Sequence, residues 1–264
     1  MIFYFSATGN SLYAAQKLAK EEQTECISIA DVMRSRDASE QYSFLAKDDE
    51  VVGFVFPIYF CGLPTIVTEF LSKLYINGIQ GHYTFLVLTY GAMDGNAAAL
   101  FHKHLTKQGL SLSAAYSICT VDSYLPMFFI PEKGEIEEIL AKANAQLEQV
   151  CTAVHKREKN QTYSSHRVGA SLCTAIMYPT YQTGRKTAKF NVGDSCTGCG
   201  LCEKVCPDRA IQLVNGKPSW VKNACVLCLG CLHRCPQGAI DYGKKTMGKK
   251  RYMNSHVAVH GDFL

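Results

Sequence analysis

The chain has 264 residues, of which 47% are hydrophobic and 19% are charged, and its formal net charge is +4. This composition argues against disorder, and the length suits one mid-sized domain joined to a smaller one. The charge is uneven, because residues 193–264 hold 10 Lys and Arg against 5 Asp and Glu. No aromatic and basic recognition motif accompanies this excess, so nucleic acid is a poor partner.

Nothing in the sequence indicates export or a membrane span. The first residues carry no basic region before an apolar run, so we expect no signal peptide. The longest uncharged stretches, 51–64 and 168–181, have about 14 residues each, fewer than the ~18 that a transmembrane helix needs. We therefore expect a cytoplasmic protein in a reducing compartment, which suits free thiols.

The first elements are a strand, a tight loop and a helix. Residues 2–5 are apolar, and residues 12–19 place small apolar side chains at helical spacing. Between them lies a loop whose hydroxyl groups and backbone N–H groups can bind a phosphate dianion. The candidate residues are Ser6, Ala7, Thr8, Gly9, Asn10 and Ser11. The loop contains no Lys or Arg, which excludes the nucleoside-triphosphate P-loop.

Strands and helices then alternate along the chain. Further strands are predicted at 25–29, 51–56, 83–90 and 113–121, and helices are predicted after Pro64, at 96–108 and at 135–157. This alternation predicts an α/β domain with a parallel sheet covered by helices on both faces.

The loop at residues 6–11 resembles the flavodoxin phosphate loop, Ser/Thr-x-Thr-Gly-x-Ser/Thr, at the same place after the first strand. The resemblance implies flavin mononucleotide (FMN) and a flavodoxin-like five-stranded parallel sheet with strand order 2-1-3-4-5. It also implies that the loops after the third and fourth strands flank the flavin ring.

The candidate residues in those two loops are Pro57, Ile58, Tyr59, Phe60, Cys61, Gly62, Tyr90, Gly91, Ala92 and Asn96. We expect Tyr59, or else Tyr90, to stack on the ring. The alternative for Tyr59 and Phe60 is packing at a strand end. Cys61 could be chemically active, although we favour a packing role for it and for the other cysteines outside the C-terminal part.

Two cysteine runs organise the C-terminal part. Cys196-x2-Cys199-x2-Cys202-x3-Cys206-Pro207 is repeated 29 positions later as Cys225-x2-Cys228-x2-Cys231-x3-Cys235-Pro236. This spacing is typical of iron–sulfur ligation, in which the fourth cysteine binds the other cluster. One [4Fe–4S] cluster would take Cys196, Cys199, Cys202 and Cys235, and the second would take Cys225, Cys228, Cys231 and Cys206. Zinc is less favoured, since structural zinc usually uses separated cysteine pairs.

The region at about 192–243 strongly resembles the two-cluster bacterial ferredoxins, a small α+β domain. We therefore expect four segments: an FMN-binding domain at 1–157, an interdomain linker at 158–191, a ferredoxin domain at 192–243, and a basic C-terminal tail at 244–264. The linker is either a packed strap or a lid near the flavin. The tail is either a docking patch or simply solvated, and we expect His233 and Arg234 to point outward.

The whole layout resembles the fused flavodoxin–ferredoxin proteins of anaerobes. The resemblance implies electron transfer between low-potential clusters and FMN, with exchange of electrons with partner redox proteins. The alternative is an FMN-dependent reductase of a small electrophilic substrate, supplied with electrons by its own clusters. A redox sensor ranks last, because no output module accompanies the two cofactor motifs.

Overall fold

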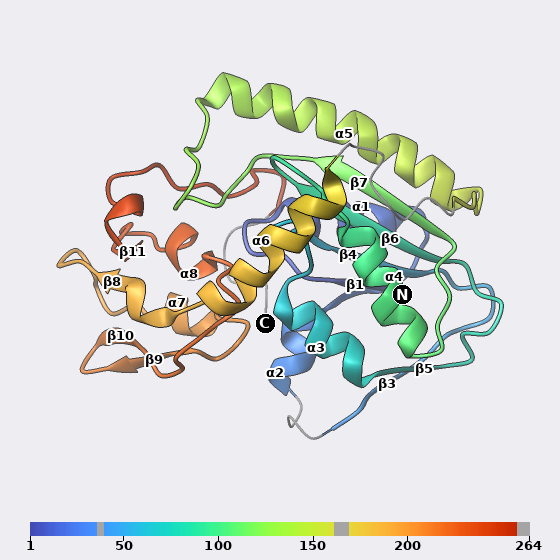
Figure 1. The fold of residues 1–264 in the computed structure, drawn as a ribbon, viewed down its shortest axis with the longest axis horizontal. Helices are drawn as coiled ribbons and strands as arrows, with labels where there is room; N and C mark the ends of the chain where they lie inside the picture. Colours follow the sequence, from blue (N-terminus) through green and yellow to red (C-terminus); the bar gives the residue numbers. More distant parts are fainter. Residues whose placement is uncertain (36–39, 161–168, 258–264) are drawn as a thin grey trace.

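The computed structural model describes residues 1–35, 40–160 and 169–257 (Figure 1). Its central element is a five-stranded parallel sheet. In spatial order its strands are β2 (Cys26–Ser28), β1 (Ile2–Tyr4), β4 (Val52–Pro57), β6 (Thr84–Tyr90) and β7 (Ala114–Cys119). The predicted flavodoxin-like order is confirmed.

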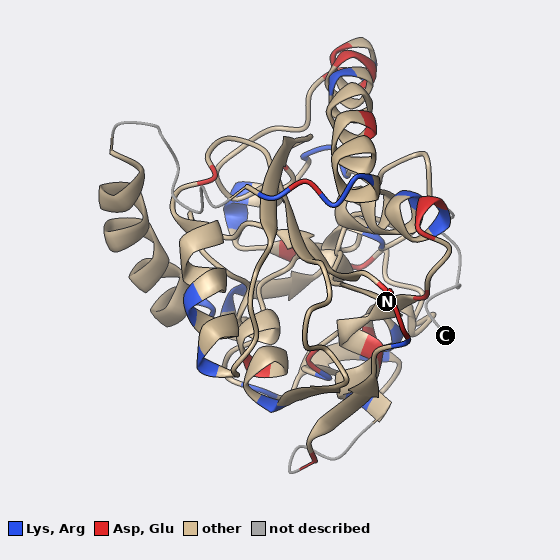
Figure 2. Cartoon of the chain, turned by 90° about the vertical axis from the view of Figure 1, so that its right-hand side faces the viewer, with Lys and Arg blue, Asp and Glu red and all other residues tan. Residues whose placement is uncertain are grey.

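Helices cover both faces of the sheet because its strands are apolar on both sides. Alternate strand residues enter two separate cores, with Phe54 and Leu86 in one and Val55 and Val87 in the other. The first core is closed by α2 (Ile29–Ser35), α3 (Thr65–Lys73) and α4 (Ala97–Lys107), and the second by α1 (Asn10–Glu21) and α5 (Lys133–His155). Charged residues lie mostly on the outer helices and loops, while the central sheet contains few of them (Figure 2).

Three features of the α/β part were not anticipated. The helix α2 follows β2 directly, and the strands β3 (Tyr42–Leu45) and β5 (Leu74–Asn77) form a separate parallel pair. The third feature is α6 (Ala170–Gly184), which lies within the predicted linker and contains Pro179. Figure 1 shows α6, in yellow, running between the sheet and the cysteine-containing part.

The C-terminal part, which we call the cysteine module, consists of two short antiparallel pairs and two short helices. Its elements are β8 (Phe190–Val192), α7 (Leu201–Lys204), β9 (Ile211–Val214), β10 (Lys217–Trp220), α8 (Gly230–His233) and β11 (Ile240–Tyr242), with single 3-10 turns η1 (Thr187–Lys189) and η2 (Lys244–Thr246). The starts of α8 and β11 lie 29 residues after those of α7 and β9, so the internal repeat is also a structural repeat.

The sheet and the cysteine module share a hydrophobic core. Val121 and Leu140 of the α/β part pack in one cluster with Leu232 and Tyr252 of the C-terminal part. This core fixes the cysteine module against the end of the sheet where β7 finishes. Among the described residues, no helix has the length and apolar character that a bilayer span requires.

Candidate functional site

An open cleft lies at the carboxyl ends of β1, β4, β6 and β7, the edge at which open parallel sheets bind ligands. Its empty volume is about 1060 Å³, including space open to solvent. All but three of the candidate residues of the α/β part line it, namely Ser6, Ala7, Thr8, Asn10, Ser11, Pro57, Ile58, Tyr59, Phe60, Cys61, Tyr90, Gly91 and Ala92. The three exceptions are Gly9, Gly62 and Asn96.

The loop at residues 6–11 turns sharply into α1. Gly9 has a φ of 97° and precedes the first helical residue, and its N–H donates to Ser6 Oγ at 3.1 Å. The first-turn N–H groups that follow have no partner inside the helix, which suits an anion. Ser11 is buried, and its hydroxyl is hydrogen-bonded to Thr89 Oγ1 at 2.7 Å.

The three exceptions contact other segments. A Cβ atom on Gly9 would lie 2.6 Å from Val257 Cγ2, and one on Gly62 would lie 2.3 Å from the Tyr178 ring. The Asn96 N–H donates to Thr174 Oγ1 at 2.8 Å, so Asn96 is bound to α6. The missing side chains of Gly9 and Gly62 therefore make room for the C-terminal segment and for α6.

The loop after β4 is a tight turn packed against aromatic rings. Tyr59 and Gly62 exchange backbone hydrogen bonds, and the intervening Phe60 and Cys61 have positive φ angles of 51° and 60°. The Tyr59 ring meets the Tyr181 ring edge-on at 5.8 Å. Burial raises the pKa of Tyr59 well above its usual range, so its phenol stays protonated.

Cys61 is held by α6. Its carbonyl accepts from Thr174 Oγ1 at 2.9 Å, and its thiol lies close enough to the Cys173 thiol to interact with it. Burial raises the pKa of Cys61 to about 12, which disfavours the reactive thiolate. This environment favours the packing role.

Sequence reasoning missed the loop after β7, which forms a further wall of the cleft. The additional lining residues are Thr89, Met93, Thr120, Val121, Asp122, Ser123, Tyr124, Met127, Phe128, Met177, Leu227, Cys228 and Leu229. The place of the loop after β7 at the cleft could have been inferred from the sequence, because the strands of a parallel sheet carry their carboxyl ends at the same edge. Asp122 accepts from the Tyr124 N–H at 2.8 Å, and burial raises the pKa of its carboxyl group.

The eight cysteines of the two runs gather in two sets. Four of them line one small cavity, namely Cys196, Cys199, Cys202 and Cys235. In the other set, Cys206 lies close enough to Cys225, Cys228 and Cys231 to interact electrostatically with them. Each set thus combines three cysteines of one run with the fourth cysteine of the other.

Backbone N–H groups point at sulfur atoms of both sets. Ala210 donates to Cys206 Sγ at 3.2 Å, and Ala239 donates to Cys235 Sγ at 3.3 Å. Such bonds stabilise cluster sulfurs.

The two sets differ in exposure. Cys199 of the first set is exposed, whereas Cys206, Cys225 and Cys231 of the second set are buried. Burial raises the pKa of Cys228 to about 12. Thiolate charge in the second set therefore needs a bound cation or cluster to balance it.

His233 and Arg234 are buried, so the expectation that they point outward was wrong. His233 Nε2 donates to Ser123 O at 2.8 Å, and Nδ1 accepts from the Tyr252 N–H at 3.1 Å. Burial lowers the pKa of His233 to about 4, so the ring is neutral at pH 7. Both residues face the α/β part because α8 packs against it.

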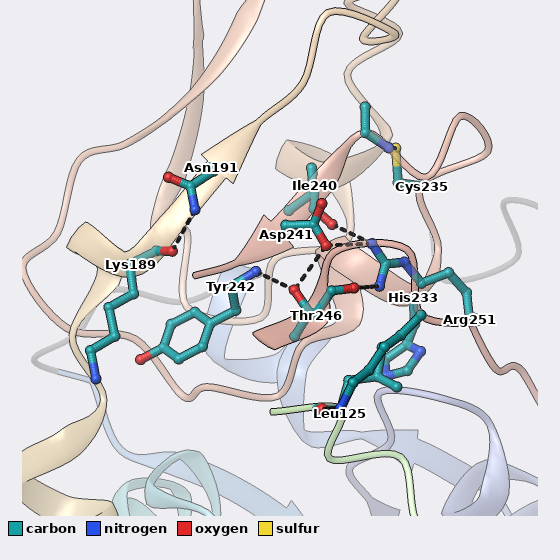
Figure 3. Close-up of polar contacts among 12 residues, drawn as sticks. Leu125, Lys189, Asn191, His233, Cys235, Ile240, Asp241, Tyr242, Thr246 and Arg251 are labelled. Atoms are coloured by element: carbon teal, nitrogen blue, oxygen red, sulfur yellow. Dashed lines mark hydrogen bonds and ion pairs between the residues drawn. The ribbon is translucent and has the colours of Figure 1, made fainter. Parts of the chain in front are cut away.

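The described part of the C-terminal segment is bound to the cysteine module. Figure 3 shows Arg251, Asp241 and Thr246 in one network: Arg251 Nη2 lies 2.8 Å from Asp241 Oδ1, and Thr246 Oγ1 donates to the same oxygen at 2.8 Å. Arg251 Nη2 also donates to Ile240 O at 2.9 Å. These contacts tie residues 246–251 to β11.

Comparisons with known proteins identify the cysteine module. Residues 195–240 match the family described as 4Fe-4S dicluster domain. No curated protein matches the chain in sequence.

Solved structures with some likeness to the chain include three flavoproteins or redox proteins. A putative flavoprotein from Bacteroides uniformis has 18% identity and a TM-score of 0.34, covering 54% of this chain and 97% of its own. Two-electron reduced Megasphaera elsdenii flavodoxin has 17% identity and a TM-score of 0.32, and the match covers 56% of this chain and 97% of the flavodoxin. Rubredoxin oxygen:oxidoreductase from Desulfovibrio gigas has 14% identity and a TM-score of 0.32, and the match covers 59% of this chain and 36% of the oxidoreductase.

These scores are low, and the strand order of the sheet is the stronger evidence for the α/β part. Together with the matched cysteine module, it makes the chain a fusion of a flavodoxin-like sheet with a 4Fe-4S dicluster domain.

Proposed function

We propose that this protein transfers electrons between two [4Fe–4S] clusters and an FMN held in the cleft. One observation carries the proposal: Leu227, Cys228 and Leu229 of the second cysteine run line the same cleft as the loop at residues 6–11. A cluster ligand and the candidate flavin loop thus share one cavity. Close contact between cofactors is what electron transfer within a protein requires.

The chemistry of the cleft fits FMN. Hydroxyl groups and first-turn N–H groups at residues 6–11 can bind a phosphate without a cation. Tyr59, Phe60 and Tyr90 supply aromatic surface for the flavin ring. When bound, FMN would link the single-electron chemistry of the clusters to two-electron chemistry.

The same layout suggests an order for the cofactors. The second set of cysteines borders the cleft through Cys228, whereas the first set reaches the surface at Cys199. A partner redox protein would therefore exchange electrons at the first cluster. The second cluster would lie between it and the flavin.

The second candidate function is that of an FMN-dependent reductase for a small electrophilic substrate. The mouth of the cleft favours it, since Met93, Met127 and Phe128 are exposed apolar residues that line the cavity. Asp122, whose carboxyl pKa is raised by burial, lies in the same cleft and could hold a proton.

An anaerobic reductive titration of the whole protein, followed by visible absorption and EPR spectroscopy, tests both candidates. An electron-transfer protein is expected to show two cluster signals and a flavin that accepts electrons one at a time. A flavin that goes directly to its two-electron form and reoxidises the clusters would favour the reductase. If the purified protein contains no flavin and binds none when FMN is added, both candidates are wrong.

A further inference from the structure

The candidate phosphate loop is held from outside the sheet. Ala7 O accepts from Arg234 Nε of the cysteine module at 3.0 Å. The next carbonyl, Thr8 O, accepts from the backbone N–H of Asn254 at 2.8 Å. Two successive carbonyl groups of the loop are therefore bound by residues far away in the sequence.

The side chain of Asn10 forms the second connection. Its Oδ1 accepts from Tyr252 Oη at 2.7 Å and from Asn254 Nδ2 at 3.0 Å. Its Nδ2 lies 3.3 Å from both Thr120 Oγ1 and Val121 O in the loop after β7. Asn10 is buried, and the C-terminal segment satisfies its acceptor oxygen.

The C-terminal segment is itself fixed at both ends. On one side, the Tyr252 N–H donates to His233 Nδ1 at 3.1 Å, which ties the segment to α8. On the other, Val257 packs over Gly9, where a Cβ atom would lie only 2.6 Å away. The segment therefore bridges the cysteine module and the loop.

These contacts orient the loop for an anion. In a trans peptide the C=O and the N–H point in opposite directions. Binding of Ala7 O by Arg234 thus turns the N–H of Thr8 away from the cysteine-module side chain. Without these partners, the carbonyl groups of Ala7 and Thr8 would rotate toward other donors, and the N–H groups of the same peptides would rotate with them.

We propose that Arg234, Tyr252 and Asn254 are positioning residues for the phosphate loop, so that the affinity for FMN depends on the cysteine module and the C-terminal segment. This inference rests on the proposed function, in which the loop binds the FMN phosphate. It adds that an isolated sheet domain would bind FMN poorly.

The test is a fluorescence titration of flavin-depleted, full-length protein with FMN and, separately, with riboflavin, which lacks the phosphate. Tyr252→Phe removes one donor to Asn10, and Arg234→Met removes the donor to Ala7 O. We expect each variant to bind FMN about tenfold more weakly, the effect of losing one buried hydrogen bond. Riboflavin affinity should stay within about twofold of wild type, because no phosphate is involved.

Tyr75→Phe is the matched control, since Tyr75 is half-exposed on β5 and does not line the cleft. Iron content and thermal unfolding of each variant show whether the clusters and the fold are retained. Tyr252→Phe is decisive if Arg234→Met loses iron, because Tyr252 is not next to a cysteine of either run.

The outcomes distinguish the positioning role from FMN binding itself. Selective weakening of FMN by Tyr252→Phe supports the positioning role. Equal weakening of FMN and riboflavin, or no weakening of either, overturns it. If wild-type protein binds FMN and riboflavin equally well, the loop does not bind the phosphate, and the part of the proposed function that places the FMN phosphate in this loop is wrong.

Discussion

The two cysteine runs have the same spacing and nearly the same backbone, but they carry different residues between the cysteines. The first reads Cys-Thr-Gly-Cys-Gly-Leu-Cys and the second Cys-Val-Leu-Cys-Leu-Gly-Cys. Gly198 and Gly200 have φ angles of 71° and 78°, and their counterparts Leu227 and Leu229 have 55° and 58°. Leucine thus adopts a left-handed conformation that glycine ordinarily provides.

The surroundings explain this difference. A left-handed conformation costs a non-glycine residue about 1–2 kcal/mol, whereas full burial of a leucine side chain contributes about 1.5–3 kcal/mol. Leu227 and Leu229 are 5% and 2% exposed, so burial offsets the strain. In the first run a Cβ atom on Gly198 would lie 2.5 Å from Gly216 O, which leaves no room for a side chain. The cysteine spacing determines the backbone conformation of each run, and the packing around the run determines whether glycine or leucine fits.

The largest expected effect comes from pairing cysteine substitutions across the two runs. If ligation is crossed, Cys206→Ser combined with Cys228→Ser removes one cluster, about four of eight irons. Cys206→Ser combined with Cys199→Ser removes both clusters and nearly all the iron. Iron analysis of anaerobically purified protein distinguishes them, with Cys151→Ser as the control. The reverse pattern would mean that each run holds its own cluster.

The second prediction exchanges the residue types of the two runs. Gly198→Leu should lower the free energy of unfolding by about 3 kcal/mol, because it combines left-handed strain with overpacking against Gly216. Gly200→Leu should lower it by only about 1 kcal/mol, since the nearest atom to its Cβ position is a Leu213 methyl carbon at 3.6 Å. Denaturant unfolding measures both values. Equal losses would show that close approach to Gly216 does not matter.

The third prediction concerns the anchoring of the second run to α6 and to Thr65 at the start of α3. Tyr181 Oη donates to Val226 O at 2.8 Å and accepts from the Thr65 N–H at 3.2 Å. Tyr181→Phe leaves the buried Val226 carbonyl and the partly buried Thr65 N–H without this partner, and it should cost about 2 kcal/mol of unfolding free energy. Tyr75→Phe, at a half-exposed position, should change stability by less than about 0.5 kcal/mol. A Tyr181→Phe variant as stable as the control would mean that water replaces the phenol.

The sequence predicted those parts of the molecule that depend on local pattern. Apolar runs and helical periodicity located the five strands of the main sheet, and cysteine spacing located the cysteine module. The loop at residues 6–11 was singled out because its residues resemble the flavodoxin phosphate loop, and its binding of a phosphate stays a prediction. Each of these signals lies within a few neighbouring residues.

The parts that were missed depend on contacts distant in sequence. Tyr252 binds Asn10 across 242 positions, and no short pattern around Tyr252 indicates this. The helix α6 buries little beyond Ala170, Thr174 and Tyr181, so its sequence shows no clear apolar stripe. The lining of the cleft by Leu227 and Leu229 requires a docked cysteine module, which sequence spacing does not describe.

The long separation between Asn10 and Tyr252 also has a consequence for biosynthesis. At about 5–20 residues per second, a ribosome needs roughly 10–50 s to translate the intervening chain. During this time β1 and α1 have left the ribosome, but the residues that hold their connecting loop have not yet been made. On the proposed function, FMN loading should therefore follow translation of both cysteine runs, and nascent chains arrested before Tyr252 should bind FMN more weakly than the full-length chain.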